Sequence, residues 1–383
     1  MKYIKLCDVC DFQGGSQPPK DEWSYELKNG YIRMLQIRDF TQKERVVPEY
    51  VKITNSTKKC EADDILIARY GASLGKILTG LSGAYNVAIM KTIPDEHVLE
   101  KKYLYYYLKS PVFQTFLLNI GNRAAQAGFN KNDLQELFIP SISKKEQAKV
   151  VNILKHAETV ISVRQQQLKK LDELVKSRFI ELFGDSVTNP YGWQQLTVND
   201  VCVSVVRGPF GSALKKEFFV PPSDTTYKVY EQKHAIQKSS TIGTYYVTAE
   251  KYNELRRFEC HSGDILMSCS GTMGELYQLP AGCERGIINQ ALCKFTLNER
   301  ILPIVFLAYM RETIGNLETK GSGIQNIAAV SYVKAMPINL PPMRVQEQFA
   351  AFVEQIDKSK LAIQQSLEKL ETLKKALMQQ YFG

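Results

Sequence analysis

The sequence predicts an α+β protein in which two similar mixed α/β domains are separated by two long helices that pair as an antiparallel coiled coil. Two observations predict this fold. The 383-residue chain repeats itself with a period near 200 residues, and each copy ends in an apolar heptad pattern. Solenoid repeats have periods of about 20–50 residues. The longer period therefore indicates a duplicated domain with a duplicated helix.

The duplication is clearest in the helical segments. Residues 168–184 match residues 367–383 at an offset of 199, and seven of these 17 positions are identical. Upstream, the run Asp64-Ile65-Leu66 matches Asp264-Ile265-Leu266, and Asn86 matches Asn289. Because the offset drifts between 192 and 203, we expect the insertions to fall in loops.

The repeat divides the chain into four segments. We predict a first mixed domain over residues 1–140, a helix over 141–184, a second mixed domain over 185–341 and a second helix over 342–383. The domain segments combine β-branched and aromatic stretches with glycine-containing turns, as α+β domains do. Each helical segment follows a proline and ends at Phe-Gly, which are start and stop signals for a helix.

Both helical segments carry an apolar seam over about four heptads, which predicts that the two helices pair. The alternative is that each helix packs only on its own domain. The predicted pairing residues are Leu154, Ile161, Leu168, Leu171, Val175 and Leu182 in the first helix and Ile356, Ile363, Leu367, Leu370 and Leu377 in the second.

Composition excludes several classes of protein. Apolar residues make up 44% and charged residues 23% of the chain, as in an ordinary globular protein. The longest apolar run, residues 301–310, is half of the roughly 20 residues that a membrane-spanning helix needs. We expect no membrane association, and we expect the eight cysteines to be reduced thiols of a cytoplasmic protein. The net charge of +9 is compatible with a polyanionic partner.

Four short motifs suggest catalysis or metal binding, but each is incomplete. Residues 71–77 lack the spacing and the Ser/Thr of a phosphate-binding loop. The run Asn189-Pro190-Tyr191 lacks the second proline of an adenine-methyltransferase loop, and Pro94-Asp95 with Glu100 is too closely spaced for a nuclease metal site. Cys7-x-x-Cys10 has no second pair at zinc spacing. We therefore predict no catalytic residue, no metal and no cofactor.

A duplicated domain on a rigid spacer is suited to reading two similar targets a fixed distance apart, and double-stranded DNA offers such targets. Base readout needs polar and basic side chains on loops that enter a groove. Loops at matching places differ in their polar residues, as two readers of different sequences require; the alternative is that they are solvated loops. The four predicted pairs of DNA-binding loops are Ser16, Gln17 and Lys20 with Arg207, Ser212, Lys215 and Lys216; Arg33, Gln36 and Arg38 with Gln232, Lys233 and His234; Arg69, Ser73 and Lys76 with Ser268, Ser270 and Thr272; and Arg123 and Gln126 with Lys320, Ser322 and Gln325.

Over nearly its whole length the chain resembles the specificity subunit of a type I restriction–modification system. The resemblance rests on the order of two variable domains and two similar helical regions, with Glu146-Gln147 and Glu347-Gln348 at the helix starts, residues 183–193 at the junction and residues 208–212 as a recognition loop. It implies that the two domains are target-recognition domains of a non-catalytic subunit. This subunit would bind a bipartite DNA target and recruit two methyltransferase (modification) subunits and motor-nuclease (restriction) subunits. The recruited subunits would hold any cofactor and methylate an extruded adenine.

Two other functions stay open on the sequence. One is a solitary enzyme, either an adenine-N6 DNA methyltransferase or a nuclease. The other is a coiled-coil scaffold that binds only proteins. Turnover by the purified chain alone would favour the first, and the absence of DNA binding would favour the second.

Overall fold

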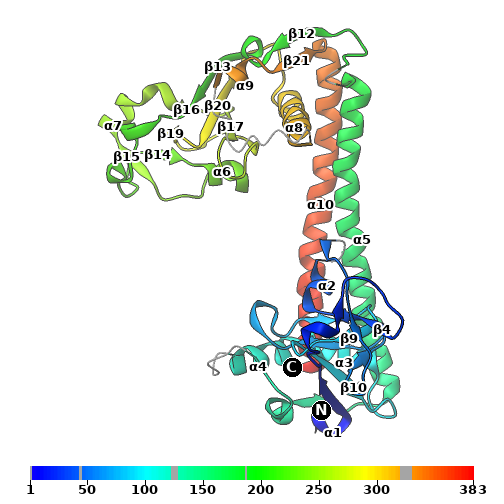
Figure 1. Cartoon of the computed structure of the whole chain (residues 1–383). Coiled ribbons are helices and arrows are strands. Elements are labelled where there is room, and N and C mark those ends of the chain that lie inside the picture. Colours follow the sequence, from blue (N-terminus) through cyan, green and yellow to red (C-terminus); the bar gives the residue numbers. More distant parts are fainter. Residues whose placement is uncertain (1, 43–44, 122–127, 186–187, 320–329) are drawn as a thin grey trace. The chain divides into compact units, whose positions relative to one another are not determined.

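The computed structural model describes residues 2–42, 45–121, 128–185, 188–319 and 330–383. The chain forms two compact units, one of residues 1–166 with 363–383 and the other of residues 167–362 (Figure 1). Each unit contains a mixed α/β domain together with part of each long helix. The α+β fold with two similar domains and two long helices in contact is therefore confirmed.

The described part of the first unit has three sheets. Their strand orders are β2-β10-β7-β8, β3-β5-β4-β9-β6 and β1-β11. All neighbouring strands are antiparallel except β4 and β9, which are parallel. The strands are β1 (Tyr3–Lys5), β2 (Cys10–Gly14), β3 (Trp23–Ser24), β4 (Tyr31–Leu35), β5 (Glu49–Lys52), β6 (Lys59–Cys60), β7 (Leu66–Ala68), β8 (Ile77–Leu78), β9 (Gly83–Tyr85), β10 (Ile89–Pro94) and β11 (Phe138–Pro140).

The second unit repeats this topology with one strand fewer, because an isolated bridge between Val220 and Tyr246 stands at the place of β3. Its sheets have the orders β13-β20-β17-β18, β15-β14-β19-β16 and β12-β21, and β14 and β19 form the corresponding parallel pair. The duplication read from the sequence is thus a duplication of fold. The strands are β12 (Gln194–Thr197), β13 (Cys202–Arg207), β14 (Thr226–Tyr230), β15 (Tyr246–Thr248), β16 (Glu259–Cys260), β17 (Ile265–Ser268), β18 (Leu276–Gln278), β19 (Gly286–Ile288), β20 (Leu292–Leu297) and β21 (Pro337–Leu340).

Short helices accompany the sheets, and two long helices follow the domains. The short helices are α1 (Leu6–Val9), α2 (Ile37–Thr41), α3 (Lys101–Leu108), α4 (Pro111–Gly121), α6 (Gln232–Gln237), α7 (Ala249–Glu254), α8 (Pro303–Thr319) and α9 (Val330–Lys334). The long helices are α5 (Lys144–Phe183) and α10 (Met343–Phe382), each of 40 residues. At about 1.5 Å per residue each is roughly 60 Å long.

The two long helices pack antiparallel in both units. In the first unit Leu154 of α5 lies in one buried cluster with Met378 and Phe382 of α10. In the second unit the ring of Phe179 on α5 lies 5.7 Å from that of Phe349 on α10. All eleven predicted pairing residues are buried or half-buried, whereas most of their helical neighbours are exposed. The predicted pairing is therefore confirmed.

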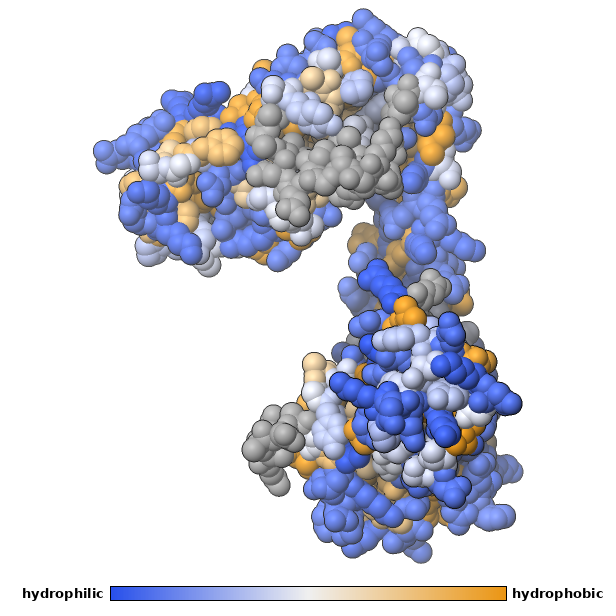
Figure 2. Space-filling view, in the orientation of Figure 1, coloured by the Kyte–Doolittle hydropathy of each residue, from blue (hydrophilic) through white to orange (hydrophobic). Residues whose placement is uncertain are grey.

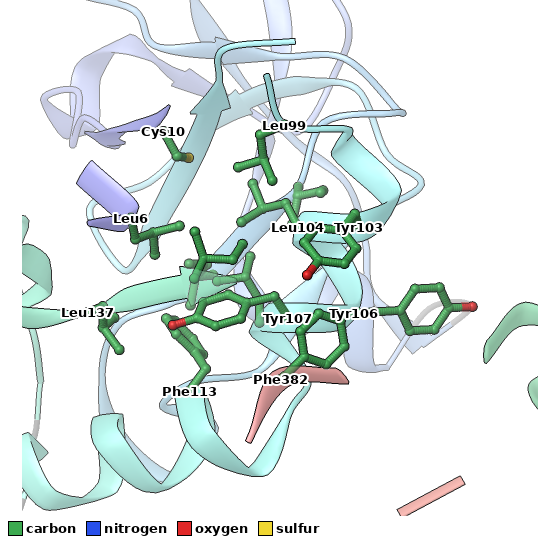
Figure 3. Close-up of a cluster of buried hydrophobic side chains, with 14 of the residues drawn as sticks. Leu6, Cys10, Leu99, Tyr103, Leu104, Tyr106, Tyr107, Phe113, Leu137 and Phe382 are labelled. Atoms are coloured by element: carbon green, nitrogen blue, oxygen red, sulfur yellow. The ribbon is translucent and has the colours of Figure 1, made fainter. Parts of the chain in front are cut away.

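The helix ends also enter the domain cores, so the alternative packing holds in part as well. Figure 3 shows Phe382 beside Tyr103 and Tyr107 of α3, with ring centroids 5.2 and 5.9 Å apart. Leu6 and Leu104 belong to the same buried cluster. Burial of these large side chains anchors the C-terminal end of α10 to the first domain.

The start of each long helix is held by a buried glutamine. Gln147 donates to the carbonyls of Val98 and Ile142 and accepts from the Glu100 amide. Gln346 makes the same three kinds of bond, with Arg300, Pro341 and Leu302. The residue equivalent to Gln147 is therefore Gln346 at an offset of 199, and the sequence alignment of Gln147 with Gln348 is wrong by two residues. The local match was misleading because the run Gln346-Glu347-Gln348 contains two glutamines two positions apart.

The face seen in Figure 2 is mainly hydrophilic, with hydrophobic residues in scattered patches. Within the described ranges, no helix is long and apolar enough to cross a membrane. The same residues contain no group of three or more His, Cys, Asp or Glu side chains placed to hold a metal ion.

Candidate nucleic-acid interface

The first predicted loop of each domain is anchored at a glycine by the same device. Gly15 follows β2, and a Cβ there would lie 2.1 Å from the Asn86 carbonyl oxygen. Gly208 follows β13, and a Cβ there would lie 1.9 Å from the Asn289 carbonyl oxygen. Only glycine permits such an approach of two backbones. The two domains therefore hold their first loops in the same place on the same scaffold.

The residues beyond these anchors are mostly exposed but differ in chemistry. Gln17 and Lys20 are exposed in the first domain, and Ser212, Lys215 and Lys216 are exposed in the second. Ser16 is only half-exposed, and Arg207 is buried, with its Nε donating to the Gln290 carbonyl.

Phe210 is an aromatic residue of this loop that the sequence reasoning did not select. It is 61% exposed, and the Arg207 guanidinium carbon lies 5.0 Å from its ring centroid. An exposed Phe beside a cation can contact a thymine methyl group or a base face. Its flanking glycines, Gly208 and Gly211, were the available signal, since they indicated a tight loop that would leave the ring outside the core.

The second predicted pair of loops lies at the starts of α2 and α6. The sequence prediction paired Gln36 with Gln232 and Arg38 with His234, at an offset of 196. The N-cap residues are Gln36 and Glu231, so equivalent positions in fact differ by 195. Gln36 thus corresponds to Glu231, and Arg38 to Lys233. The predicted alignment of these two segments was wrong by one residue. Neither segment contains a Gly or Pro that would have fixed the alignment.

This shift places His234 inside the second domain. It occupies the N3 position that Asp39 has in the first domain. His234 is fully buried, its Nδ1 accepts from the Glu231 amide, and its Nε2 lies 2.8 Å from the Ile242 carbonyl. Burial lowers the pKa of this imidazole below its ordinary value, which fits a neutral capping residue. As placed, its ring nitrogens are occupied within the protein and are not offered to DNA.

Arg33 is likewise used within its domain, because its guanidinium pairs with the buried Asp39 at 2.8 Å. Gln232 bonds the carbonyls of Ser270 and Thr272, which brings the second and third predicted loops of this domain together. Lys233 is half-exposed, and its ammonium lies 5.3 Å from the ring centroid of Tyr245.

The third predicted pair of loops follows β7 and β17 and mixes exposed with structural residues. Lys76 and Thr272 are exposed, and Ser73 and Ser270 are half-buried. Ser268 is fully buried, where its hydroxyl donates to the Thr272 carbonyl and accepts from the Glu275 amide. Arg69 donates hydrogen bonds to the Phe129 and Val87 carbonyls, so part of its guanidinium is already bonded to the backbone.

The fourth predicted pair, Arg123 and Gln126 with Lys320, Ser322 and Gln325, lies outside the described residues. The incomplete Cys7-x-x-Cys10 motif lies within the described residues. Cys10 is buried, and burial raises the pKa of its thiol to about 12.

A cleft of about 530 Å³ brings four of the predicted residues together on the first domain. Gln17 and Lys20 come from the loop after β2, and Gln36 and Arg38 come from the start of α2. The remaining lining residues are Trp23, Ser24, Tyr25 and Glu49. Polar, charged and aromatic side chains thus line one open cavity.

An internal ion pair repeats in both domains and was missed from the sequence. Asp64 pairs with Lys91 at 2.5 Å, and Asp264 pairs with Lys294 at 3.4 Å. Each acid lies just before a central strand, β7 or β17, and each lysine lies in the neighbouring strand, β10 or β20. The repeated Asp-Ile-Leu run was the available signal, but the lysine partner on the neighbouring strand cannot be identified without the strand register.

Comparison with known proteins agrees with this duplicated architecture. The family model for the type I restriction modification DNA specificity domain matches twice, over residues 1–173 and 190–374. The chain is 22% identical over 175 residues to the type I restriction enzyme EcoBI specificity subunit of Escherichia coli, and 22% identical over 156 residues to the MjaVIII specificity subunit of Methanocaldococcus jannaschii. These matches cover 43% and 41% of this chain but only 37% and 36% of the relatives' own lengths.

Solved structures show the same fold. One is described as "Structural basis underlying complex assembly and conformational transition of the type I R-M system"; it aligns over 100% of this chain and 97% of its own, with a TM-score of 0.68 and 15% identity. The type I restriction–modification S subunit from M. genitalium aligns over 100% of this chain and 96% of its own, with a TM-score of 0.50 and 15% identity. Because the family model matches most of the sequence in two copies, the chain belongs to the family of type I restriction–modification DNA specificity subunits.

Proposed function

We propose that this chain binds a bipartite DNA target, with one half-site read by each domain, and that it acts as the non-catalytic recognition subunit of a type I restriction–modification complex. The observation that carries the proposal is the pair of anchored loops. Gly15 and Gly208 fix the same backbone position, yet the exposed residues that follow differ between the domains. A common scaffold with different polar tips suits the reading of two different base sequences.

The charges available at these tips suit DNA contact. Lys20, Arg38 and Lys76 in the first domain and Lys215 and Lys216 in the second are all exposed. Such side chains would contact phosphates and position each domain, while neighbouring polar residues would read base edges. A net charge of +9 gives modest attraction to DNA by itself, so tight binding would depend on partner subunits that close around the duplex.

The long helices would set the distance between the two half-sites. Each is continuous over 40 residues, and each packs against the other in both units. A paired helical spacer resists bending better than a flexible linker, so it would fix the number of base pairs between the half-sites.

We also propose that two methyltransferase subunits and the motor-nuclease subunits assemble on this chain, as in the type I systems that it resembles. The partners would bring S-adenosylmethionine and the chemistry, and the complex would act in the cytoplasm. This chain would contribute recognition only.

Sequencing of methylated adenines in cells with and without the gene tests this proposal. We expect a two-part motif with a fixed spacer that disappears when the gene is deleted. Exchange of residues 185–341 for the second domain of a related subunit should replace one half of the motif and leave the other unchanged. A methylation pattern independent of the gene would contradict the proposal, and turnover of DNA by the purified chain alone would favour the solitary enzyme.

A further inference from the structure

The cleft on the first domain has a counterpart on the second, and strand register identifies its residues. In the first domain Ser24 pairs with Tyr50, and Tyr50 pairs with Arg33. In the second domain Val220 pairs with Tyr246, and Tyr246 pairs with Lys228. Ser24 therefore corresponds to Val220.

The residues just before these paired positions line the cleft or its counterpart. Trp23 corresponds to Phe219, and Glu49 corresponds to Tyr245. Arg38 corresponds to Lys233, as the helix caps already showed. Both domains thus place an aromatic residue on the outermost strand segment and a cation on the neighbouring helix.

The two domains fill this place differently. In the second domain the Tyr245 ring stacks on Phe219, with centroids 4.5 Å apart and an angle of 22° between the planes, and the Lys233 ammonium lies above Tyr245. In the first domain the position of Tyr245 is taken by Glu49, which has no ring. The half-buried Trp23 packs against the cluster of Met34, Val51 and Ala84, and the 530 Å³ cleft opens beside it. The second domain therefore supplies from its own chain a planar ring that the first domain lacks.

The polar groups of the cleft define what ring would fit. The carboxylate of Glu49 is 17% exposed and accepts from the Gln36 amide at 2.6 Å and from the Arg38 guanidinium. The Trp23 indole nitrogen donates to the Pro18 carbonyl at 3.1 Å, which fixes the indole plane. Tyr25 is 73% exposed at the rim, and Lys20 is exposed beside it.

We propose that this cleft binds one nucleobase that has left the base stack, and the inference rests on the proposed DNA-binding function. The base would stack on Trp23 in the place that Tyr245 occupies in the second domain. Its exocyclic amino group would donate to Glu49, and Lys20 would contact the adjoining phosphate. A carboxylate accepts from the exocyclic amino groups of adenine, cytosine and guanine, whereas thymine has no exocyclic amino group. The cleft thus selects an amino-bearing base.

The chain offers a built-in probe of this cleft, because it has only two tryptophans. In the full-length Trp193→Phe variant all tryptophan emission comes from Trp23. We expect the single-stranded pentamers dA5 and dC5 to quench this emission, and dT5 to bind at least fivefold more weakly. Anisotropy of the same oligonucleotides carrying a fluorescein label reports binding anywhere on the protein.

Further variants separate stacking from charge and from folding. Stacking of a base on an aromatic ring supports affinity by about 1–3 kcal/mol, so Trp23→Ala should weaken dA5 binding at least fivefold, whereas Trp23→Phe should retain most of it. Glu49→Ala should remove the preference for dA5 over dT5. Tyr25→Ala changes a side chain too exposed to affect folding and should weaken binding. Phe138→Ala, 45% exposed on β11, is the matched control and should change nothing.

Three results would overturn the inference. The first is oligonucleotide binding by anisotropy with unchanged Trp23 emission, and the second is equal affinity of the Ala and Phe variants at position 23. The third is failure of every pentamer to bind. Methylation mapping in cells would then decide separately whether the chain still recognises duplex DNA.

Discussion

Lengthening the helical spacer should lengthen the DNA target. The structure shows where the insertion must be made. The ion pairs Glu158–Lys374 and Asp172–Lys360 lie 14 residues apart on each helix, which is two heptads. Seven residues inserted after Gln167 in α5 and after Gln364 in α10 fall between these pairs on both helices. Both ion pairs and the apolar seam would then be preserved.

The size of the effect follows from helix and DNA geometry. Seven residues at about 1.5 Å each lengthen the spacer by about 10 Å. At about 3.4 Å per base pair along a DNA strand, the spacer between the half-sites should grow by about 3 base pairs. The half-site sequences should stay the same, because no domain residue is changed.

Methylated-adenine sequencing of cells that express the variant with its partner subunits measures the new spacer. A heptad inserted into α5 alone is the matched control. It shifts Glu158 and Asp172 relative to their lysines, so it should lower the melting temperature and abolish modification. A doubly extended variant that folds and methylates the original motif with an unchanged spacer would refute the role of the helices in setting the distance.

Three further perturbations test the fold and the interface. Gly15→Ala and Gly208→Ala each place a Cβ about 2 Å from a carbonyl oxygen, so each should displace its loop. Each should reduce methylation of target DNA in cells more than tenfold. Normal methylation by either variant would show that its loop is not used. Leu154→Ala should lower the free energy of unfolding by about 2–5 kcal/mol in urea titrations, whereas Leu174→Ala, 47% exposed on the same helix, should cost less than about 1 kcal/mol. Burial tends to raise the pKa of Glu158, but a hydrogen bond from Lys374 and the charge of Lys109 outweigh it, and the pKa ends below its ordinary value near 4.5. A carboxylate whose pKa is lower in the folded than in the unfolded protein stabilises the fold at pH values above the unfolded pKa, and this stabilisation is lost as the pH falls. Glu158→Gln should therefore lower the free energy of unfolding by about 1 kcal/mol at pH 7 and by much less at pH 3.5. An equal effect at both pH values would contradict the ion pair.

The helical part of this fold was predictable because its signal is periodic. The repeat and the heptad spacing predicted both long helices and their contact, and all eleven residues predicted to pair are buried or half-buried. Periodicity could not show that Lys360 and Lys374 also occupy seam positions, because a sequence pattern counts charged residues as solvent-facing. Both lysines are half-buried, and their pairing with acidic residues on α5 is visible only in the structure.

The candidate interface was less predictable, because short polar runs do not reveal which side chains face outward. His234 and Ser268 looked like loop residues, yet both are buried and cap local backbone. Trp23 and Phe210 are not among the predicted DNA-binding residues, yet one lines a cleft and the other is 61% exposed. Whether a side chain caps a turn or faces a ligand depends on strand register, and the two copies drift in register within their loops.

The ion pairs between the long helices also explain which helices pair. Lys360 and Lys374 of α10 take the places of Ile161 and Val175 of α5, at the offset of 199. Two α5 helices paired in the same antiparallel register would therefore set Glu158 and Asp172 opposite apolar residues. Each ion pair between α5 and α10 contributes only about 0.2–1 kcal/mol. A pair of α5 helices would lose this contribution, and it would also be destabilised by carboxylates that face apolar residues. The charges thus favour α5 with α10 of one chain over α5 with α5 of two chains, even though the apolar seams are nearly alike.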